Sequence, residues 1–149
     1  MQFALVFFLN TILVLITILI HYEALYHLAN FLPKLKRLTP RYRVLLGVCV
    51  IFVCHVFEIW IFALGYYGTL HLNGMGVLKG DYSPDGTFLD CVYLSFITFT
   101  TVGYGDLVAQ GYVRYLTGLE ALTGLVLVTW SASFLFIEMQ KYWNISKHS

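Results

Sequence analysis

Residues 88–106 read FLDCVYLSFITFTTVGYGD, and this stretch largely decides the fold. Residues 88–99 are mostly apolar and follow Thr87, whose hydroxyl can cap a helix start, while Asp90 adds a negative charge near the positive helix end. As a helix, 88–99 would reach only about 18 Å, whereas the hydrocarbon core of a bilayer is about 30 Å thick. The sequence therefore predicts a short re-entrant helix that enters the membrane and turns back on the same side.

Residues 98–106, TFTTVGYGD, come directly after this helix. A dehydrated K⁺ ion needs a cage of oxygens, which successive backbone carbonyls supply if alternating signs of φ point them the same way, and glycine tolerates such a backbone. GYG alone would be a common glycine-aromatic turn, but the longer pattern resembles the filter of the potassium channel pore superfamily. The resemblance implies that K⁺ binds the carbonyls of Thr101, Val102, Gly103 and Tyr104 and the hydroxyl of Thr101, that Gly103 and Gly105 permit the backbone, and that four chains assemble around the ion.

The composition indicates a membrane protein. Of 149 residues, 59% are hydrophobic and 11% are charged, whereas soluble domains carry about a quarter charged residues. Three apolar runs are long enough to span, because a crossing needs about 20 residues, and little chain remains for a soluble domain. The three cysteines lie inside apolar runs without metal-ligand spacing, which favours apolar packing over disulfide or metal roles.

The fold class that we expect is an all-α membrane protein with three transmembrane helices per subunit and a re-entrant pore helix. Residues 1–32 would form an N-terminal transmembrane helix with its extension, 33–43 a basic cytoplasmic linker, 44–140 the pore domain, and 141–149 a short cytoplasmic tail. Within the pore domain we expect an outer helix at 44–67, an extracellular loop at 68–87, a pore helix at 88–99, a filter at 100–106 and an inner helix at 113–138. The loop holds five glycines at 68–86 and shows no alternating apolar pattern, so no strand is expected there.

Charge sets the expected orientation. Five basic residues cluster between the first two apolar runs, namely Lys34, Lys36, Arg37, Arg41 and Arg43. The positive-inside rule places this cluster in the cytoplasm, which puts the N-terminus outside and the C-terminus inside. We expect a multi-pass protein of the cell membrane, of a bacterial inner membrane by the resemblance, that does not bind nucleic acid. Asp81, Asp85 and Asp106 would concentrate cations at the outer mouth.

Polar residues inside apolar runs are candidates for filter support. Glu58 and Glu120 fall at filter depth, where a carboxyl is costly without a partner. Either could hydrogen-bond the pore-loop backbone, or take part in ordinary interhelical hydrogen bonding. His55, one helical step from Glu58, is a pH-sensing candidate or a packing residue. Thr100 is a further support candidate, and Tyr93 stands where many relatives carry a bracing tryptophan.

The inner helix carries the remaining candidates. Gly124 lies where the family commonly has a hinge glycine, with close helix packing as the alternative. The cavity and inner gate would be lined by Thr129, Ala132, Ser133, Phe136 and Gln140.

The function that we expect is a homotetrameric K⁺ channel with K⁺ as the permeant ion, membrane lipid around it, no organic cofactor and no enzymatic activity. One alternative is a cation channel of weak selectivity, against which Tyr104 argues. Another is a non-conducting accessory subunit. The gating stimulus and any regulatory partner do not follow from the sequence.

Overall fold

The computed structural model describes residues 2–72, 74–80 and 86–143. Its elements in chain order are α1 (Gln2–Phe31), a short 3₁₀ helix (Leu32–Lys34), α2 (Pro40–Leu70), β1 (Gly76–Gly80), α3 (Phe88–Phe99), β2 (Leu107–Gly111) and α4 (Val113–Trp143). In these ranges, three helices are long and apolar enough to cross a membrane, namely α1, α2 and α4. The expected helical fold class with three such helices is confirmed.

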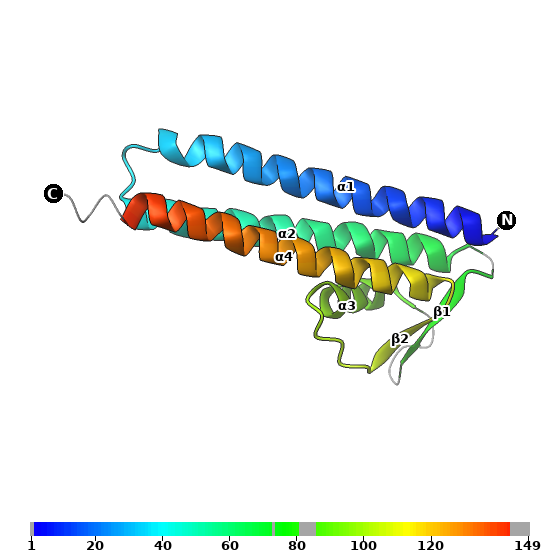
Figure 1. Ribbon diagram of the computed structural model, residues 1–149. Coiled ribbons are helices and arrows are strands. Elements are labelled where there is room, and N and C mark those ends of the chain that lie inside the picture. Colours follow the sequence, from blue (N-terminus) through cyan, green and yellow to red (C-terminus); the bar gives the residue numbers. More distant parts are fainter. Residues whose placement is uncertain (1, 73, 81–85, 144–149) are drawn as a thin grey trace.

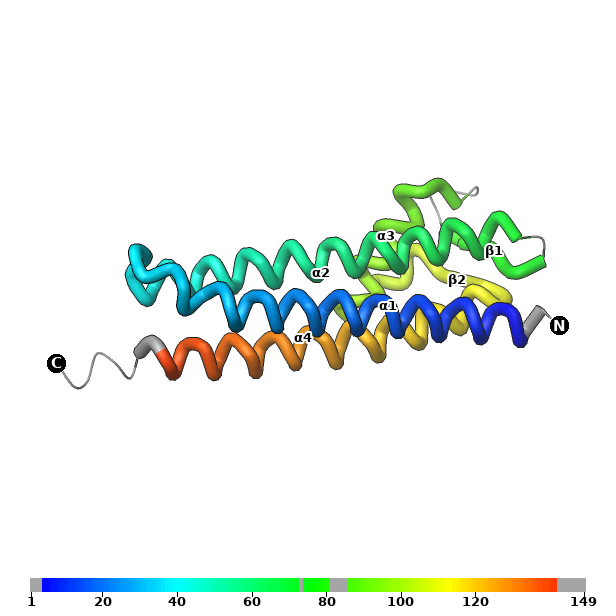
Figure 2. Tube along the Cα trace, turned by 90° about the horizontal axis from the view of Figure 1, so that it is seen from above, coloured from blue at the N-terminus to red at the C-terminus, as the bar shows by residue number. Residues whose placement is uncertain are grey.

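The three long helices run lengthwise beside one another (Figure 1). α3 and the two strands lie against the end of the bundle where α1 begins, and α4 ends at the opposite end. Seen from above, α1 lies between α2 and α4, and it packs on both (Figure 2). α3 also packs on α2 and α4. The helices α2 and α4 therefore contact both α1 and α3.

Two of the long helices, α2 and α4, extend beyond the expected ranges. α2 begins at Pro40 rather than at 44, because proline is well tolerated in the first helical turn, where its missing N–H would have no partner anyway. The basic linker is accordingly shorter than expected. The Arg43 side chain stabilises it, since Nε donates to the carbonyls of Leu35 at 3.0 Å and Leu38 at 3.1 Å.

The short helix α3 has the bounds that the sequence indicated. The Thr87 hydroxyl accepts from the Asp90 backbone N–H at 3.3 Å, and the Asp90 carboxylate accepts from the Thr87 N–H at 2.8 Å. This capping box satisfies two backbone donors at the helix start. The helix is therefore fixed in register relative to the residues that follow it.

The expectation of a loop without strands at 68–87 is wrong. Gly76–Gly80 pairs antiparallel with Leu107–Gly111, with Gly76 opposite Gly111. Leu78, Leu107 and Ala109 face the core, while Val77 and Val108 are exposed. The partner strand lies beyond the pore helix, so the glycines of the first strand gave no local sign of pairing. The small sheet joins the chain just before α3 to the chain just after the glycine-rich turn.

Candidate functional site

The residues after α3 form a turn in which the sign of the backbone angle φ alternates. Thr101, Gly103 and Gly105 have φ values of 59°, 49° and 82°, whereas Val102 and Tyr104 between them do not have positive φ. This is the alternation that we expected for carbonyls that point the same way. A Cβ added at Gly103 or Gly105 would meet no atom within 4 Å, so glycine is needed there for backbone conformation and not for space.

The end of α3 holds this turn through backbone hydrogen bonds. The Gly103 N–H donates to the Ile97 carbonyl at 2.9 Å, and the Thr101 N–H donates to the Thr98 carbonyl at 2.9 Å. The Thr100 hydroxyl donates to the Phe96 carbonyl at 2.7 Å. Thr100 therefore satisfies a carbonyl at the end of the helix, where carbonyls lack intrahelical partners.

A side-chain contact fixes the outer end of the turn. The Tyr93 hydroxyl donates to the Asp106 carboxylate at 2.6 Å. This hydrogen bond to the carboxylate raises the pKa of Tyr93 to about 12, because it favours the neutral phenol. Tyr93 thus links the middle of α3 to the residue that follows Gly105.

Residues 100–106 are exposed in the single chain. Val102 is 53% exposed and Tyr104 is 73% exposed, although both belong to a segment next to apolar helices. Irregular backbone is tolerated at membrane depth only where it is buried in protein or lines a water-filled path. The turn therefore needs further protein or an aqueous path on its open side.

Behind α3 lies a cluster that we call the outer cluster, formed by Tyr66, Ser95 and Glu120. All three are fully buried, and they come from α2, α3 and α4. The Tyr66 hydroxyl donates to Glu120 Oε2 at 2.5 Å, Ser95 Oγ bonds to Glu120 Oε1, and Ser95 Oγ donates to the Ile59 carbonyl at 2.7 Å. The cluster thus connects α3 to both α2 and α4.

The outer cluster is complete only when Glu120 carries a proton. Its three hydrogen bonds need three protons, while the hydroxyls of Tyr66 and Ser95 supply one each. A protonated Glu120 can donate to Ser95 Oγ, and Ser95 then donates to the Ile59 carbonyl. Of the two interpretations of Glu120, interhelical hydrogen bonding is the one that the structure shows, and through Ser95 it supports α3.

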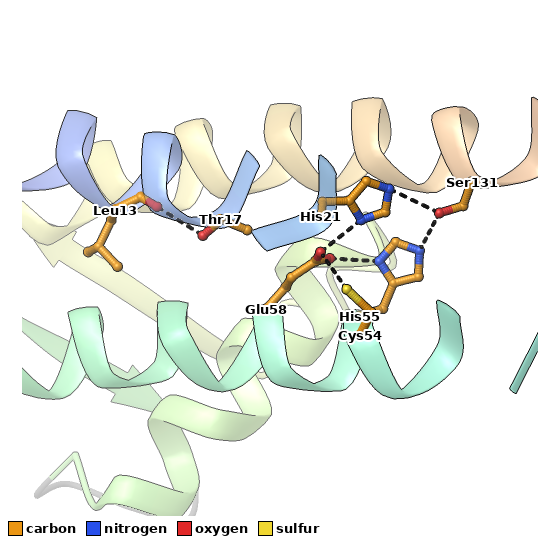
Figure 3. A network of polar contacts seen from close by, with 7 residues as sticks. All are labelled: Leu13, Thr17, His21, Cys54, His55, Glu58 and Ser131. Atoms are coloured by element: carbon orange, nitrogen blue, oxygen red, sulfur yellow. Dashed lines mark hydrogen bonds and ion pairs between the residues drawn. The ribbon is translucent and has the colours of Figure 1, made fainter. Parts of the chain in front are cut away.

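Of the two interpretations of Glu58, interhelical hydrogen bonding is the one that the structure shows. The Glu58 carboxylate contacts the Nδ1 atoms of His21 and His55, each at 2.8 Å, and accepts from the Cys54 thiol at 3.3 Å. Both histidine Nε2 atoms lie 3.2 Å from Ser131 Oγ (Figure 3). We call His21, His55, Glu58 and Ser131 the middle cluster. Glu58 therefore makes an interhelical hydrogen bond to α1, and the two histidines connect it to Ser131 of α4.

Gly124 lets the inner helix touch the end of the pore helix. A Cβ at Gly124 would lie 2.2 Å from the Phe99 carbonyl oxygen, which is closer than any real contact. Close packing, one of the two interpretations of Gly124, is what the structure shows. α4 is continuous from Val113 to Trp143, and the hinge role stays a prediction.

α4 has two opposite faces at its C-terminal half. At 3.6 residues per turn, Leu127, Ser131 and Glu138 share one side, and all three are buried. The residues expected to line the cavity share the opposite side and are exposed: Thr129, Ala132, Ser133, Phe136 and Gln140.

Of the three acids expected at the outer mouth, Asp106 lies beside the turn, and Asp81 and Asp85 lie outside the described residues. His21, Tyr66, Ser95 and Ser131 are further residues of these clusters that were not expected from the sequence. Each is a polar or aromatic-hydroxyl residue inside or beside an apolar run, which is a signal for intramembrane function. The sequence did not show which of these residues meet one another when the helices pack.

A family model described as an ion channel matches residues 45–141, which is more than half of the chain. The chain belongs to this ion channel family, whose domain is of the two-transmembrane K⁺ channel type, so the resemblance to the potassium channel pore superfamily is confirmed. The match begins after α1, which the family model does not cover. Comparison with curated proteins and with solved structures gave no match.

Proposed function

We propose that four copies of this chain form a K⁺-selective channel and that K⁺ passes through a filter made by residues 101–105. The observation that carries this proposal is the alternation of φ in the segment TVGYG, with positive values at Thr101, Gly103 and Gly105. This alternation turns successive carbonyls toward one side, as a cage for a dehydrated K⁺ ion requires. The Thr101 hydroxyl and the carbonyls of 101–104 would be the ligands.

The homotetramer is supported by what one chain leaves uncovered. A single chain supplies one wall of a cage, and its filter residues Val102 and Tyr104 are largely exposed. The exposed face of α4 adds a stripe of small and polar side chains that ends at Phe136. In the assembly this stripe would line a cavity below the filter, and four Phe136 side chains would narrow its mouth by excluding water.

The orientation that we propose has the N-terminus outside and the C-terminus in the cytoplasm of a cell. The structure supports it in that α1, α2 and α4 alternate in direction, with the basic linker at the end opposite to α3. Asp106 would then stand at the outer mouth and concentrate cations.

The test is ion flux from liposomes that contain the purified chain. We expect K⁺ flux with a reversal potential that follows the K⁺ gradient and not the Na⁺ gradient. Gly103→Ala and Gly105→Ala should abolish selective flux, because a methyl group at positive φ costs about 1–2 kcal/mol per residue in each of four chains.

The matched control is Gly68→Ala, since Gly68 lies on α2, has no positive φ and has open space around its Cβ position. Selective K⁺ flux in both filter variants would disprove the filter assignment. Equal permeability to Na⁺ in the parent would instead indicate a cation channel of weak selectivity, and absence of flux would indicate an accessory subunit.

A further inference from the structure

The middle cluster lies between the three long helices. It joins His21 of α1 to His55 and Glu58 of α2 and to Ser131 of α4 (Figure 3). His21, Glu58 and Ser131 are buried, and His55 is mostly covered. α1 lies outside the residues that the ion channel family shares, so this cluster attaches an additional helix to a pore domain.

The contacts within the cluster form a closed ring. Glu58 Oε1 lies 2.8 Å from His21 Nδ1, and Glu58 Oε2 lies 2.8 Å from His55 Nδ1. Ser131 Oγ closes the ring at 3.2 Å from each Nε2 atom. The two imidazole rings are nearly parallel, with centroids 5.2 Å apart. Each of these four contacts requires one proton between its two atoms.

A proton count decides the charge of the ring. Ser131 supplies one proton, so the other three must come from His21, His55 and Glu58 together. Two neutral histidines and an ionised Glu58 hold only two protons, which leaves one Nε2 facing an oxygen without a hydrogen between them. A third proton completes every contact. Because an imidazole is ordinarily a stronger base than a carboxylate, this proton resides on a histidine and makes it an imidazolium.

The same third proton makes the ring electrically neutral. One imidazolium balances the Glu58 carboxylate, whereas two protons would leave a net charge of −1 and four would leave +1. An uncompensated charge in the interior of a membrane protein is expensive. Hydrogen bonding and charge balance therefore select the same number of protons.

The ligand atoms of His21, His55 and Glu58 lie within 4.8 Å of one another, which is a spacing that a metal site could also have. Zn²⁺ bound tetrahedrally, with ligand distances of about 2.0–2.1 Å, would hold its ligand atoms about 3.3 Å apart. The separations of 2.8 Å between Nδ1 and carboxylate oxygen fit hydrogen bonds instead. A divalent ion with one carboxylate would also leave a net charge of +1.

We propose that the middle cluster is a proton-binding site, in which His21 and His55 share one imidazolium that Glu58 neutralises, and that this proton fastens α1 to α2 and α4. Rotation of the Ser131 hydroxyl decides which of the two histidines carries the charge. The inference concerns the attachment of α1 and holds whichever ion the pore conducts.

The residues that surround the ring do not change the number of protons that it needs. From α2, the Cys54 thiol donates its own proton to Glu58 Oε1 at 3.3 Å. From α4, the Trp130 ring lies 5.6 Å from the His21 ring, and from α3 the Phe99 ring lies 5.6 Å from the His55 ring. His21 is the titratable group that α1 presents to the ring. The contact with Phe99 places the site directly beside the end of the pore helix.

The variant Glu58→Gln tests the number of protons in the ring. A glutamine can accept from His21 Nδ1 through its oxygen and donate to His55 Nδ1 through its amide, so the ring is complete with two neutral histidines. We expect ¹⁵N NMR of histidine-labelled full-length protein at pH 8 to show one imidazolium in the parent and none in Glu58→Gln. His21→Gln and His55→Gln in the parent background assign the signal to the ring.

Two controls keep the test decisive if a variant is unstable. Cys54→Ala removes a neighbour of the same carboxylate without changing the count, so the imidazolium signal should persist. At pH 8 the melting temperature of Glu58→Gln should stay within about 3 °C of that of the parent, because the ring is complete in both. Two neutral histidines in the parent, or one equivalent of bound zinc by elemental analysis, would overturn the proposal.

Discussion

The outer and middle clusters are both built around a buried carboxyl, yet they hold different parts of the molecule. Glu120 bonds Tyr66 and Ser95 and thereby fixes the pore helix within the residues that the family shares. Glu58 bonds His21 and His55 and thereby fixes α1, which lies outside those residues. Neutral partners surround Glu120, which completes its contacts as an acid, whereas imidazoles surround Glu58, which completes its contacts as a carboxylate. The type of partner thus decides the charge state and the helix that each carboxyl attaches.

The largest expected effect comes from the point where the inner helix touches the pore helix. In Gly124→Ala the new methyl group would lie 2.2 Å from the Phe99 carbonyl oxygen, so α3 or α4 must shift. Such overpacking costs about 1–3 kcal/mol per chain, and four chains multiply it in a tetramer. We expect loss of K⁺ flux and of tetramer on gel filtration. Gly118→Ala on the same helix is the control, because its Cβ would meet nothing within 4 Å and should leave both unchanged.

Breaking the outer cluster should affect the pore helix. Glu120→Leu removes the acceptor for the Tyr66 hydroxyl and the donor to Ser95, at a cost of about 1–3 kcal/mol. Glu120→Gln should be tolerated, because its oxygen accepts from Tyr66 and its amide donates to Ser95. The measurements are thermal stability of the assembly and K⁺ flux. If the leucine variant matches the parent in both, the outer cluster does not support the pore helix.

The two clusters should respond independently. Along α2, Glu58 and Tyr66 are eight residues apart, which is about 12 Å of helix, and the clusters share no residue. Glu58→Gln and Glu120→Gln each change the free energy of unfolding. We expect these two changes to add within about 0.5 kcal/mol in the double variant. A larger deviation would show that α1 and the pore helix are coupled through Phe99, which contacts both His55 and Gly124.

The smallest effect is expected at the solvent-side contact of α3. Asp106→Asn removes the charge that holds the pKa of Tyr93 at about 12, so this pKa should fall toward the ordinary value of about 10. The sign follows because the carboxylate favours the neutral phenol, and the neutral amide favours it less. NMR of ring-labelled tyrosine against pH measures the change, with Tyr93→Phe to assign the signal. An unchanged titration would show that Tyr93 does not bond Asp106 in the assembled protein.

Much of the pore region could be read from local sequence. The bounds of α3 follow from a capping box whose members are three residues apart, and the glycines of the filter segment coincide with positive φ. The sheet could not be read in this way, because Gly76–Gly80 pairs with a strand that follows the pore helix and the filter segment. The same limit applies to Glu58, whose position along α2 was evident while the face it presents was not.

The sequence by itself determined that this chain has three helices able to span a membrane, a short helix between the second and third, and a TVGYG segment after it. These features depend on apolar run length, capping and the conformational freedom of glycine, all of which act within a few residues. Only the tertiary structure decided which polar side chains meet inside the bundle. A carboxyl in an apolar helix demands a partner, but whether Glu58 meets histidines of α1 or a pore-loop amide depends on helix rotation and packing across segments distant in sequence.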